Sequence, residues 1–324
     1  MESMHSRKFN TWLFYVLLVI PFLLPGLMSC QKEKEEVPPS IPDARFLAIL
    51  IRDGYDLNGN GEIDPLEASA VTSLDISYDS IRDLTGIEMF TNLQSLDCSS
   101  NQIETMDLGQ NTQLVILRCF ENQLKSLDVS MLTQLWELNC RNNPLNSLDV
   151  SHNPELVFLG CNACKLSELN LSQQDQLKYL FCAYNNLSEL EVQGDSLLEF
   201  NATENLIAYL SLGTSPHLNN LDISDNPIGE LDVSAYPVLE RLSCENNDLD
   251  TLDLSHNPLL QWLFCGDNPI RYLDLRQNSD ISKLGLRRMP ELIRVCVWVW
   301  PFPPEGLYLD TTYTSGVIFT TECN

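Results

Sequence analysis

The chain has 324 residues, enough for one large domain or two ordinary ones, and 44% of them are hydrophobic, as in a globular protein. It carries 45 acidic and 19 basic residues, for a net charge of −26. This acidity argues against a nucleic-acid-binding protein, because binding to phosphates is driven by lysine and arginine. Four histidines are too few for a rich catalytic or zinc site, whereas the acidic surface suits sites for cations.

The first 29 residues have the layout of a secretory signal. Two basic residues precede an apolar run over residues 12–28, and the run ends in Leu27-Met28-Ser29-Cys30. This ending resembles the lipobox of bacterial lipoproteins, in which the cysteine is acylated and becomes the mature N-terminus. We therefore expect residues 1–29 to be removed and Cys30 to be lipidated; an ordinary signal peptide or a membrane anchor is the alternative. Only the lipid would then attach the protein to a membrane.

Residues 30–42 have the composition of a disordered tether. A charged run is followed by Val37-Pro38-Pro39, and the stretch has no apolar surface to bury. An acidic stretch directly after a lipidated cysteine is similar to the surface-export signal of some Gram-negative outer-membrane lipoproteins; a plain solvated linker is the alternative. We expect an outer-membrane lipoprotein of a Gram-negative bacterium, exposed at the cell surface.

A calcium-binding loop is predicted at residues 56–67, inside a helical cap at residues 43–70. The twelve residues fit the EF-hand loop, because oxygen-bearing side chains stand at positions 1, 3, 5, 9 and 12 and Gly61 at position 6 provides the sharp turn. The position-7 residue contributes its backbone carbonyl. An apolar stripe before the loop and Pro65 after it indicate flanking helices. The expected Ca²⁺ ligands are Asp56, Asn58, Asn60, Glu62, Asp64 and Glu67.

EF-hands usually occur in pairs, and this loop has no second copy in the sequence. We therefore expect weak binding, with a dissociation constant on the order of 10⁻⁴ to 10⁻³ M. The expected role is structural, with Ca²⁺ stiffening a helical cap over the open end of the domain that follows. A polar turn that resembles the loop by chance, or a degenerate loop that binds no ion, is the alternative.

Residues 71–298 repeat with a period of 21. An asparagine closes each Leu-x-x-Leu-x-Cys-x-x-Asn unit, Cys164 takes its place once, and one step is shortened to 20. Asp79 and Met289 extend the register, which gives about eleven coils. The asparagines are Asn101, Asn122, Asn143, Asn185, Asn205, Asn226, Asn247 and Asn268. This pattern resembles the leucine-rich-repeat family, including its internalin-like bacterial members.

The resemblance implies a parallel sheet on a concave face, to which each coil contributes one short strand. A second apolar alternation follows ten residues later, as in Leu127-Asp128-Val129. Because 21 residues leave no room for a full helix, the convex side should be extended or turn-like. The predicted fold class is a leucine-rich-repeat solenoid, mostly β, with a small helical EF-hand-like cap at its N-terminus. Residues 299–324 should form a β cap whose aromatic side chains cover the last coil.

Most cysteines belong to the repeat. Cysteine acts there as a small hydrophobic residue in an inward-facing ladder, which comprises Cys98, Cys119, Cys140, Cys161, Cys182, Cys244 and Cys265. Cys161 and Cys164 match CxxC only by letter, because both are repeat positions; a metal or redox array is the alternative. Cys296 and Cys323 lie outside the ladder, where an oxidising compartment would allow them to form a disulfide that fastens the last coil.

Ligand-binding residues should be those that the repeat does not dictate. Side chains alternate along each strand, so the residues that flank the inward leucine point to solvent on the concave face. Neighbouring coils place an aromatic patch with two arginines there, and a smaller patch further along: Arg118, Phe120, Arg141, Phe158, Tyr179 and Phe181, then Trp262 and Phe264. Exposed aromatics with arginine are typical of a recognition hot spot; scattered aromatics without a function are the alternative.

These observations favour a non-catalytic scaffold at the cell surface that mediates protein–protein interaction or adhesion through its concave sheet. Glycan binding is the nearest alternative, since aromatic rings also stack on sugars, and a structural envelope component is a third. The expected partner is a protein or a polysaccharide, without nucleic acid and without an organic cofactor. We do not expect an enzyme, because His152 and His256 recur at the same convex turn and the carboxylates follow the repeat instead of converging on a cleft.

Overall fold

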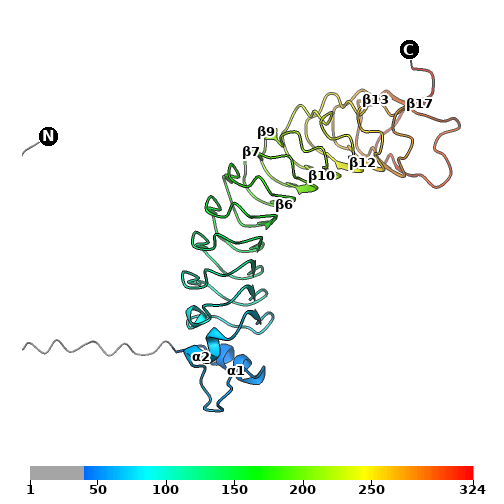
Figure 1. Ribbon diagram of the computed structural model, residues 1–324. Helices are drawn as coiled ribbons and strands as arrows, with labels where there is room; N and C mark the ends of the chain where they lie inside the picture. The colour runs from blue at the N-terminus through cyan, green and yellow to red at the C-terminus, as the bar shows by residue number, and fades with distance from the viewer. Residues whose placement is uncertain (1–39, 324) are drawn as a thin grey trace, which may run out of the picture. The chain divides into compact units, whose positions relative to one another are not determined.

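The structure is a computed structural model that describes residues 40–323. The predicted signal segment, Cys30 and most of the predicted tether lie outside these residues. Within them the chain winds into a solenoid whose coils stack side by side along a curved axis (Figure 1). The helical elements are α1 (Ala44–Arg52), α2 (Pro65–Ser69) and the 3-10 turn η1 (Ile87–Met89). None of the described helices is both long and apolar enough to cross a bilayer.

Twelve parallel strands of three residues each form one sheet along the inner side of the curve (Figure 1). The central residues of neighbouring strands are aligned, as Leu117 is with Leu138, so each repeat position continues straight along the face. In spatial order the strands are β1 (Ser73–Asp75), β2 (Ser95–Asp97), β3 (Ile116–Arg118), β4 (Glu137–Asn139), β5 (Phe158–Gly160), β6 (Tyr179–Phe181), β8 (Glu199–Asn201), β10 (Asn220–Asp222), β11 (Arg241–Ser243), β12 (Trp262–Phe264), β14 (Lys283–Gly285) and β16 (Tyr308–Asp310). The predicted solenoid with a parallel concave sheet is confirmed.

The convex side is mostly turn-like, as the repeat length predicts. Two short sheets interrupt it. The first pairs β7 (Glu189–Glu191) with β9 (Tyr209–Ser211). The second, at the C-terminal end, contains β13 (Tyr272–Asp274), β15 (Arg294–Cys296) and β17 (Ile318–Thr320).

The core is a stack of leucines and cysteines. On the concave strands from β1 to β14 the inward residue and the residue two positions later are buried, as are Leu117 and Cys119. Seven free cysteines are buried in this way, and an eighth, Cys164, is buried at the asparagine position. Loss of solvation raises the pKa of Cys182 and of Cys265 to about 12, so these two thiols stay protonated at neutral pH and pack as small apolar side chains.

A row of buried asparagines connects neighbouring coils. Asn143 accepts the N–H of Leu124 at 3.0 Å and donates its amide to the carbonyls of Cys119 and Cys140, at 3.0 and 2.9 Å. Cys164 replaces asparagine in one coil and donates its thiol to the carbonyl of Cys140 at 3.3 Å. The row satisfies backbone groups that would otherwise be buried without partners, at a typical net gain of about 1 kcal/mol per hydrogen bond.

A second row of buried amides follows ten residues after the first. Its asparagines donate across the coil boundary to two carbonyls of the preceding coil, as Asn153 does to Val129 and Leu132, at 2.9 and 2.8 Å. Its glutamine, Gln174, donates to one, that of Val150, at 2.8 Å. The row contains Asn111, Asn153, Gln174, Asn257 and Asn278. This row was not predicted from the sequence, because leucine, aspartate, serine and tyrosine interrupt it in other coils.

The N-terminal end is closed by helices. Asp43 caps α1 by accepting the N–H groups of Arg45 and Phe46, at 2.8 and 3.2 Å. Its other oxygen accepts the N–H groups of Arg82 and Asp83 in the first coil, at 3.0 and 3.2 Å. Phe46 is fully buried, and its ring stacks on Phe90 with centroids 6.4 Å apart. One carboxylate thus starts the helix and also holds it against the solenoid.

The C-terminal segment adds a further coil, which corrects the predicted count of eleven. β16 joins the concave sheet as its twelfth strand, and β17 joins the outer sheet. A loop over residues 298–306 makes this coil longer than 21 residues. The 21-residue period therefore did not predict this coil. The aromatic side chains do pack here: the ring centroid of Phe302 lies 5.7 Å from Trp298 and 4.9 Å from Phe319. A disulfide joins Cys296 to Cys323, with Cα atoms 6.0 Å apart.

Candidate binding surface

Three aromatic side chains lie together on the concave face at β5 and β6. The ring centroid of Phe158 is 6.3 Å from that of Tyr179 and 5.5 Å from that of Phe181. All three side chains are half-buried, so each ring leaves part of its surface to solvent. Gly160 makes room for them, because a Cβ there would lie 3.2 Å from the Phe158 ring. We call Phe158, Tyr179 and Phe181 the aromatic cluster.

A cation–π pair lies beside the aromatic cluster. The guanidinium of Arg141 stands 4.5 Å from the centroid of the Phe120 ring. The same guanidinium is 3.5 Å from the carboxylate of Glu121, and both partners are nearly half exposed. Such a cation–π contact contributes about 0.5–1 kcal/mol, and an exposed ion pair contributes less. The pair therefore fixes the Phe120 ring on the face without removing it from solvent.

Arg118 lies on the same face but belongs to an ion pair. Its guanidinium binds the carboxylate of Glu137 on the next strand through two hydrogen bonds, of 2.7 and 2.9 Å. This hydrogen bonding raises the pKa of Arg118, against a smaller opposing effect of burial. The arginine that the sequence placed among the aromatic residues is therefore paired with a carboxylate, whereas Arg141 contacts an aromatic ring.

The second predicted patch is organised by cations. Arg241, Trp262 and Lys283 occupy the same position on β11, β12 and β14. The Arg241 guanidinium lies 4.2 Å and the Lys283 ammonium 3.6 Å from the centroid of the indole ring. Phe264 lies against the next strand, where a Cβ on Gly285 would approach its ring to 2.5 Å. Neither cation was predicted as part of this patch, although they stand 21 residues before and after Trp262.

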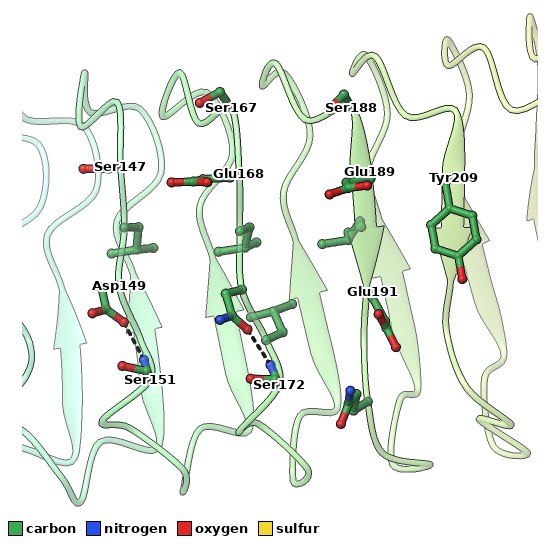
Figure 2. Close-up of a pocket in the computed structure, with 16 residues that line it drawn as sticks. Ser147, Asp149, Ser151, Ser167, Glu168, Ser172, Ser188, Glu189, Glu191 and Tyr209 are labelled. Atoms are coloured by element: carbon green, nitrogen blue, oxygen red, sulfur yellow. Dashed lines mark hydrogen bonds between the residues drawn. The ribbon is translucent and has the colours of Figure 1, made fainter.

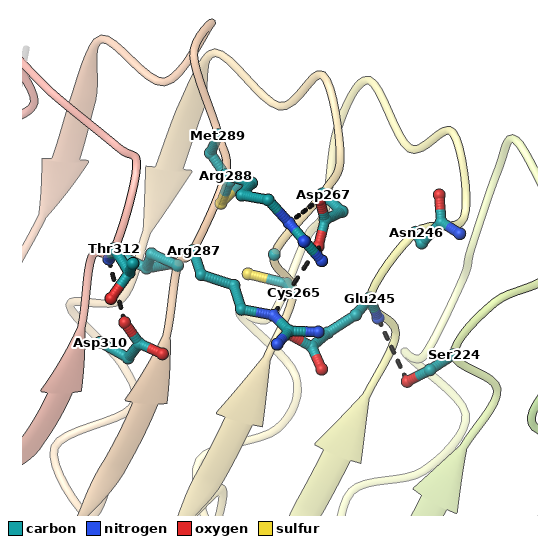
Figure 3. Close-up of polar contacts among 12 residues, drawn as sticks. Ser224, Glu245, Asn246, Cys265, Asp267, Arg287, Arg288, Met289, Asp310 and Thr312 are labelled. Atoms are coloured by element: carbon teal, nitrogen blue, oxygen red, sulfur yellow. Dashed lines mark hydrogen bonds and ion pairs between the residues drawn. The ribbon is translucent and has the colours of Figure 1, made fainter.

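Basic and acidic side chains form a network just beyond these strands. Arg287 lies 3.0 Å from the carboxylate of Glu245 and 3.7 Å from that of Asp267, and Arg288 binds Asp267 at 2.6 and 2.9 Å (Figure 3). Burial raises the pKa of Glu245, and the charge of Arg287 opposes that effect. The network neutralises the arginines locally, so Arg241 and Lys283 carry the positive charge that is available on this part of the concave face.

Comparison with known proteins identifies the family. A stretch of 71 residues, 22% of this chain, is 39% identical to Internalin J of Listeria monocytogenes serotype 4b (strain F2365). The solved functional domain of InlJ from Listeria monocytogenes, which includes a cysteine ladder, is 31% identical with a TM-score of 0.68. That match covers 84% of this chain and 70% of the domain. The chain belongs to the internalin-like leucine-rich-repeat family.

Other solved structures share the leucine-rich-repeat fold. The internalin InlF of Listeria monocytogenes matches 90% of this chain and 99% of its own, at 20% identity and a TM-score of 0.53. A leucine-rich-repeat protein from Bacteroides thetaiotaomicron matches 79% of this chain and 36% of its own, at 15% identity and a TM-score of 0.60. No family model matches the chain. The chain spans only 8% of the length of Internalin J, so the two share a repeat region and not a whole protein.

The predicted calcium loop of this internalin-like chain is closed by its own acidic side chains. Asp56 accepts the N–H groups of Gly59 and Asn60 through one oxygen, at 2.8 and 3.2 Å, and that of Gly61 through the other, at 2.9 Å. Gly61 adopts φ of +82°, the left-handed conformation that the sharp turn requires. The side-chain amide of Asn58 lies 3.3 Å from the carboxylate of Asp64, which brings loop positions 3 and 9 together.

Glu67 closes the loop from the other side. Its buried carboxylate accepts the N–H groups of Leu57, Asn58 and Asp64, at 2.8, 3.1 and 3.0 Å. Together with Asp64 it forms the capping box of α2, so it also has a local role in starting that helix. Among residues 40–323, no group of three or more His, Cys, Asp or Glu side chains is arranged to hold a metal ion. A cation in this loop would therefore depend on the side-chain oxygens of Asn58 and Asn60 as well.

The convex side carries an open groove that the sequence analysis did not anticipate (Figure 2). Its volume is about 820 Å³, its floor is formed by buried leucines, and serine and glutamate repeat along its walls up to Tyr209. Ser151 at its margin contacts the ring of His152 at 3.1 Å, but the same contact recurs between Ser255 and His256. These serine–histidine pairs are exposed neighbours in a repeated turn, so the groove contains no nucleophile and base brought together from separate elements.

Proposed function

We propose that this chain is a non-catalytic scaffold that binds a protein partner at the cell surface through its concave sheet. The observation that carries the proposal is the aromatic cluster: three partly exposed rings from two strands, beside the Phe120–Arg141 pair. Tyrosine, tryptophan and arginine dominate the residues that contribute most of the free energy in protein interfaces, and bulky aromatics act there as anchors. A sheet held by two rows of buried amides also presents these rings with little conformational entropy left to lose.

The geometry of the rings favours a protein over a glycan. The plane of Phe158 is tilted by 38° to that of Tyr179 and by 46° to that of Phe181. A sugar stacks on one flat aromatic face, whereas tilted rings offer edges and faces to an irregular apolar surface. Glycan binding therefore remains the alternative that the experiment has to separate.

The test is a pull-down of protein partners, run beside a glycan array, with Phe158→Ala and Phe181→Ala. Each substitution should weaken capture of the protein partner by about 30-fold, corresponding to the roughly 2 kcal/mol of a hot-spot residue. Tyr272→Ala is the matched control, since Tyr272 is 61% exposed on β13 of the convex side. Binding that neither phenylalanine affects would contradict the proposal, and a glycan signal that both abolish would replace the protein partner by a polysaccharide.

We also propose that the loop at residues 56–67 binds Ca²⁺ and thereby stiffens the helical cap. The supporting observations are the turn at Gly61 and the convergence of Asp56, Asp64 and Glu67 on the loop backbone. Calcium at about tenfold above its dissociation constant should raise the free energy of unfolding by about 1.4 kcal/mol. Thermal unfolding with CaCl₂ and with a chelator measures this, and Asp56→Ala should remove the difference. An identical transition in both solutions would show that the loop does not bind the ion.

Attachment to the membrane is proposed to occur through a lipid on Cys30. The support comes from the sequence alone, in the lipobox-like ending of the apolar run. Cys30 lies outside the residues that the structure describes. Mass spectrometry of the mature N-terminus should detect an acylated cysteine, and Cys30→Ser should release the protein from the membrane fraction. Protease treatment of intact cells then tests exposure at the outer membrane surface of a Gram-negative host. An unmodified N-terminus upstream of Cys30 would contradict the anchor.

A further inference from the structure

The last coil of the solenoid is covered less completely than the coils before it. In the preceding coil the inward residues Leu284 and Val295 are fully buried. The corresponding residues of the last coil, Leu309 on β16 and Phe319 on β17, are only half-buried. Large apolar side chains are also exposed around this end: Trp300, Tyr308, Tyr313 and Ile318. Apolar surface therefore gathers where the stack stops.

The concave sheet ends here with an open backbone edge. The N–H of Tyr308 donates to Ser282 at 2.9 Å, and the carbonyl of Asp310 accepts from Leu286 at 2.7 Å. Backbone groups of successive residues in a strand point to opposite sides, so the N–H and carbonyl of Leu309 face away from the sheet. Within residues 40–323 no strand pairs with that side of β16.

The outer sheet ends in the same way. The N–H of Ile318 donates to Ile293 at 3.0 Å, and the carbonyl of Thr320 accepts from Val297 at 2.9 Å. The N–H and carbonyl of Phe319 consequently face away from β15, and β17 is the last strand of its sheet in the described part of the chain. The molecule thus offers two open edges at one end, one concave and one convex.

We propose that two copies of this chain associate end to end through β16 and β17 of each copy. A two-fold axis that runs from the concave to the convex face reverses the strand direction, so each strand pairs antiparallel with its own counterpart. Leu309 then stands opposite Leu309 of the second copy and exchanges both backbone hydrogen bonds with it, and Phe319 does the same. Such an interface is self-complementary and covers the half-buried core of both copies at once.

The side chains at the edge are compatible with this pairing. In the antiparallel arrangement Tyr308 lies opposite Asp310 of the second copy, and Ile318 lies opposite Thr320. The hydrogen bond from Thr312 lowers the pKa of Asp310, so this carboxylate is charged at neutral pH. It would face a phenol rather than another carboxylate, and directly opposed like charges are avoided.

The other end of the molecule limits the assembly to two copies. Head-to-tail stacking would require an open first coil, but α1 and α2 cover that coil and bury Phe46, Leu50 and Ala68 in the core. A repeating head-to-tail contact would produce a filament, whereas contact between two C-terminal ends uses the outer sides of β16 and β17 in both copies and does not repeat. The helical cap and the open edges together specify a closed dimer.

The test is the oligomeric state of the purified full chain, measured by sedimentation velocity and light scattering in a detergent that keeps any N-terminal lipid dispersed. The wild-type chain should be a concentration-dependent dimer. Tyr308→Glu places a carboxylate opposite Asp310 on both sides of the axis and should weaken dimerisation at least about tenfold. Tyr308→Lys, of similar length and opposite charge, should leave the dimer intact or strengthen it. Tyr308 is 54% exposed, so neither change removes core packing.

Tyr272→Glu is the matched control, because Tyr272 is as exposed as Tyr308 but lies on β13, at the opposite edge of the outer sheet from β17. It should remain dimeric, and circular dichroism should show that all variants keep the same fold. A wild-type chain that is monomeric up to high micromolar concentration would overturn the proposal. Equal effects of glutamate and lysine at position 308, or growth into filaments, would also overturn it.

Discussion

The two ends of the solenoid close the same apolar core by different means. At the N-terminal end, helices lie across the first coil, and one carboxylate, Asp43, hydrogen-bonds both α1 and the coil. At the C-terminal end the chain adds one more coil, packs aromatic rings against it and fastens it with a disulfide. The first arrangement buries the core completely, whereas the second leaves Leu309 and Phe319 half-buried.

The difference shows what a repeat protein needs in order to stop. A coil can be buried only by a neighbour, so the terminal coil needs an element that the repeat does not provide. A helix satisfies its own backbone hydrogen bonds and can cover the end without offering a new edge. A further coil moves the open edge outward by one strand and leaves two rows of backbone groups available. The sequence differences at the two ends therefore have consequences for stability and for association.

The largest expected effect comes from the closed end. Phe46→Ala should lower the free energy of unfolding by about 3–5 kcal/mol, because it removes a fully buried ring and leaves a cavity under α1. Phe319→Ala is the matched change at the open end and, in a single copy, should cost less, about 1–2 kcal/mol, because that ring is partly solvated already. Urea denaturation of both variants measures the contrast. Equal losses would show that the two ends bury their aromatic rings equally well.

Reducing the disulfide should destabilise the open end only. Closing a loop of 27 residues contributes up to about 3–4 kcal/mol in the chain-entropy description. Hydrogen exchange should therefore quicken over β15 to β17 when Cys296 and Cys323 are reduced or replaced by serine. The amides of α1 and β1 serve as the internal control and should keep their protection. Faster exchange at both ends would mean that the bond stabilises the whole solenoid and not its last coil.

Acid should weaken the closed end through Asp43. Burial alone would raise the pKa of this carboxyl, but hydrogen bonds from four backbone N–H groups outweigh it, and the pKa is lowered. The stabilisation is therefore present above the unfolded pKa of about 3.9 and is lost as the pH falls through the lower folded value. Asp43→Ala should cost about 1 kcal/mol at pH 7 and flatten stability in that acidic range. Asp43→Asn keeps an acceptor oxygen and should retain part of the stability that Asp43→Ala loses at pH 7. If the loss of stability in acid were the same in Asp43→Ala as in the wild type, Asp43 would not be the group responsible.

The smallest effect is expected from the cysteines between the two ends. Eight free thiols among residues 40–323 are buried, and loss of solvation raises the pKa of most of them. In the native state a thiol reagent should label none of the eight, even with a reductant present, while the reduced Cys296 and Cys323 become reactive. Peptide mapping before and after denaturation gives the result. Native labelling of Cys140 or Cys161 would show that the middle coils open readily.

Periodicity predicted the parts of the structure that repeat and missed those that break the period. The cysteine ladder and the concave sheet follow from one 21-residue spacing. The last coil was not predicted because the loop at residues 298–306 places Leu309 more than 21 residues after Leu284, its partner in the preceding coil. The second amide row was missed because Gln174 substitutes for asparagine and other coils lack the amide altogether.

On the concave face, spacing alone was enough to bring Phe158 and Phe181 together, because their strands are adjacent. It could not show that Arg118 pairs with Glu137, since that depends on which way two long side chains turn. The two cations over the Trp262 ring were predictable from the sequence, because Arg241 and Lys283 occupy the same position in the neighbouring coils.

The second amide row also fastens the coils unevenly along the solenoid. Its amides connect coils at Asn111, Asn153 and Gln174, with Leu132 as a break, and again at Asn257 and Asn278. Between them Ser215 donates to Leu212 of its own coil, at 2.6 Å, and Tyr236 occupies the next place in the row. In this stretch the coils are held instead by the first amide row, through Asn185, Asn205 and Asn226, and by the pairing of β7 with β9. A force along the solenoid axis would therefore be carried there partly by backbone strand pairing on the convex side, where other coils use a side-chain amide.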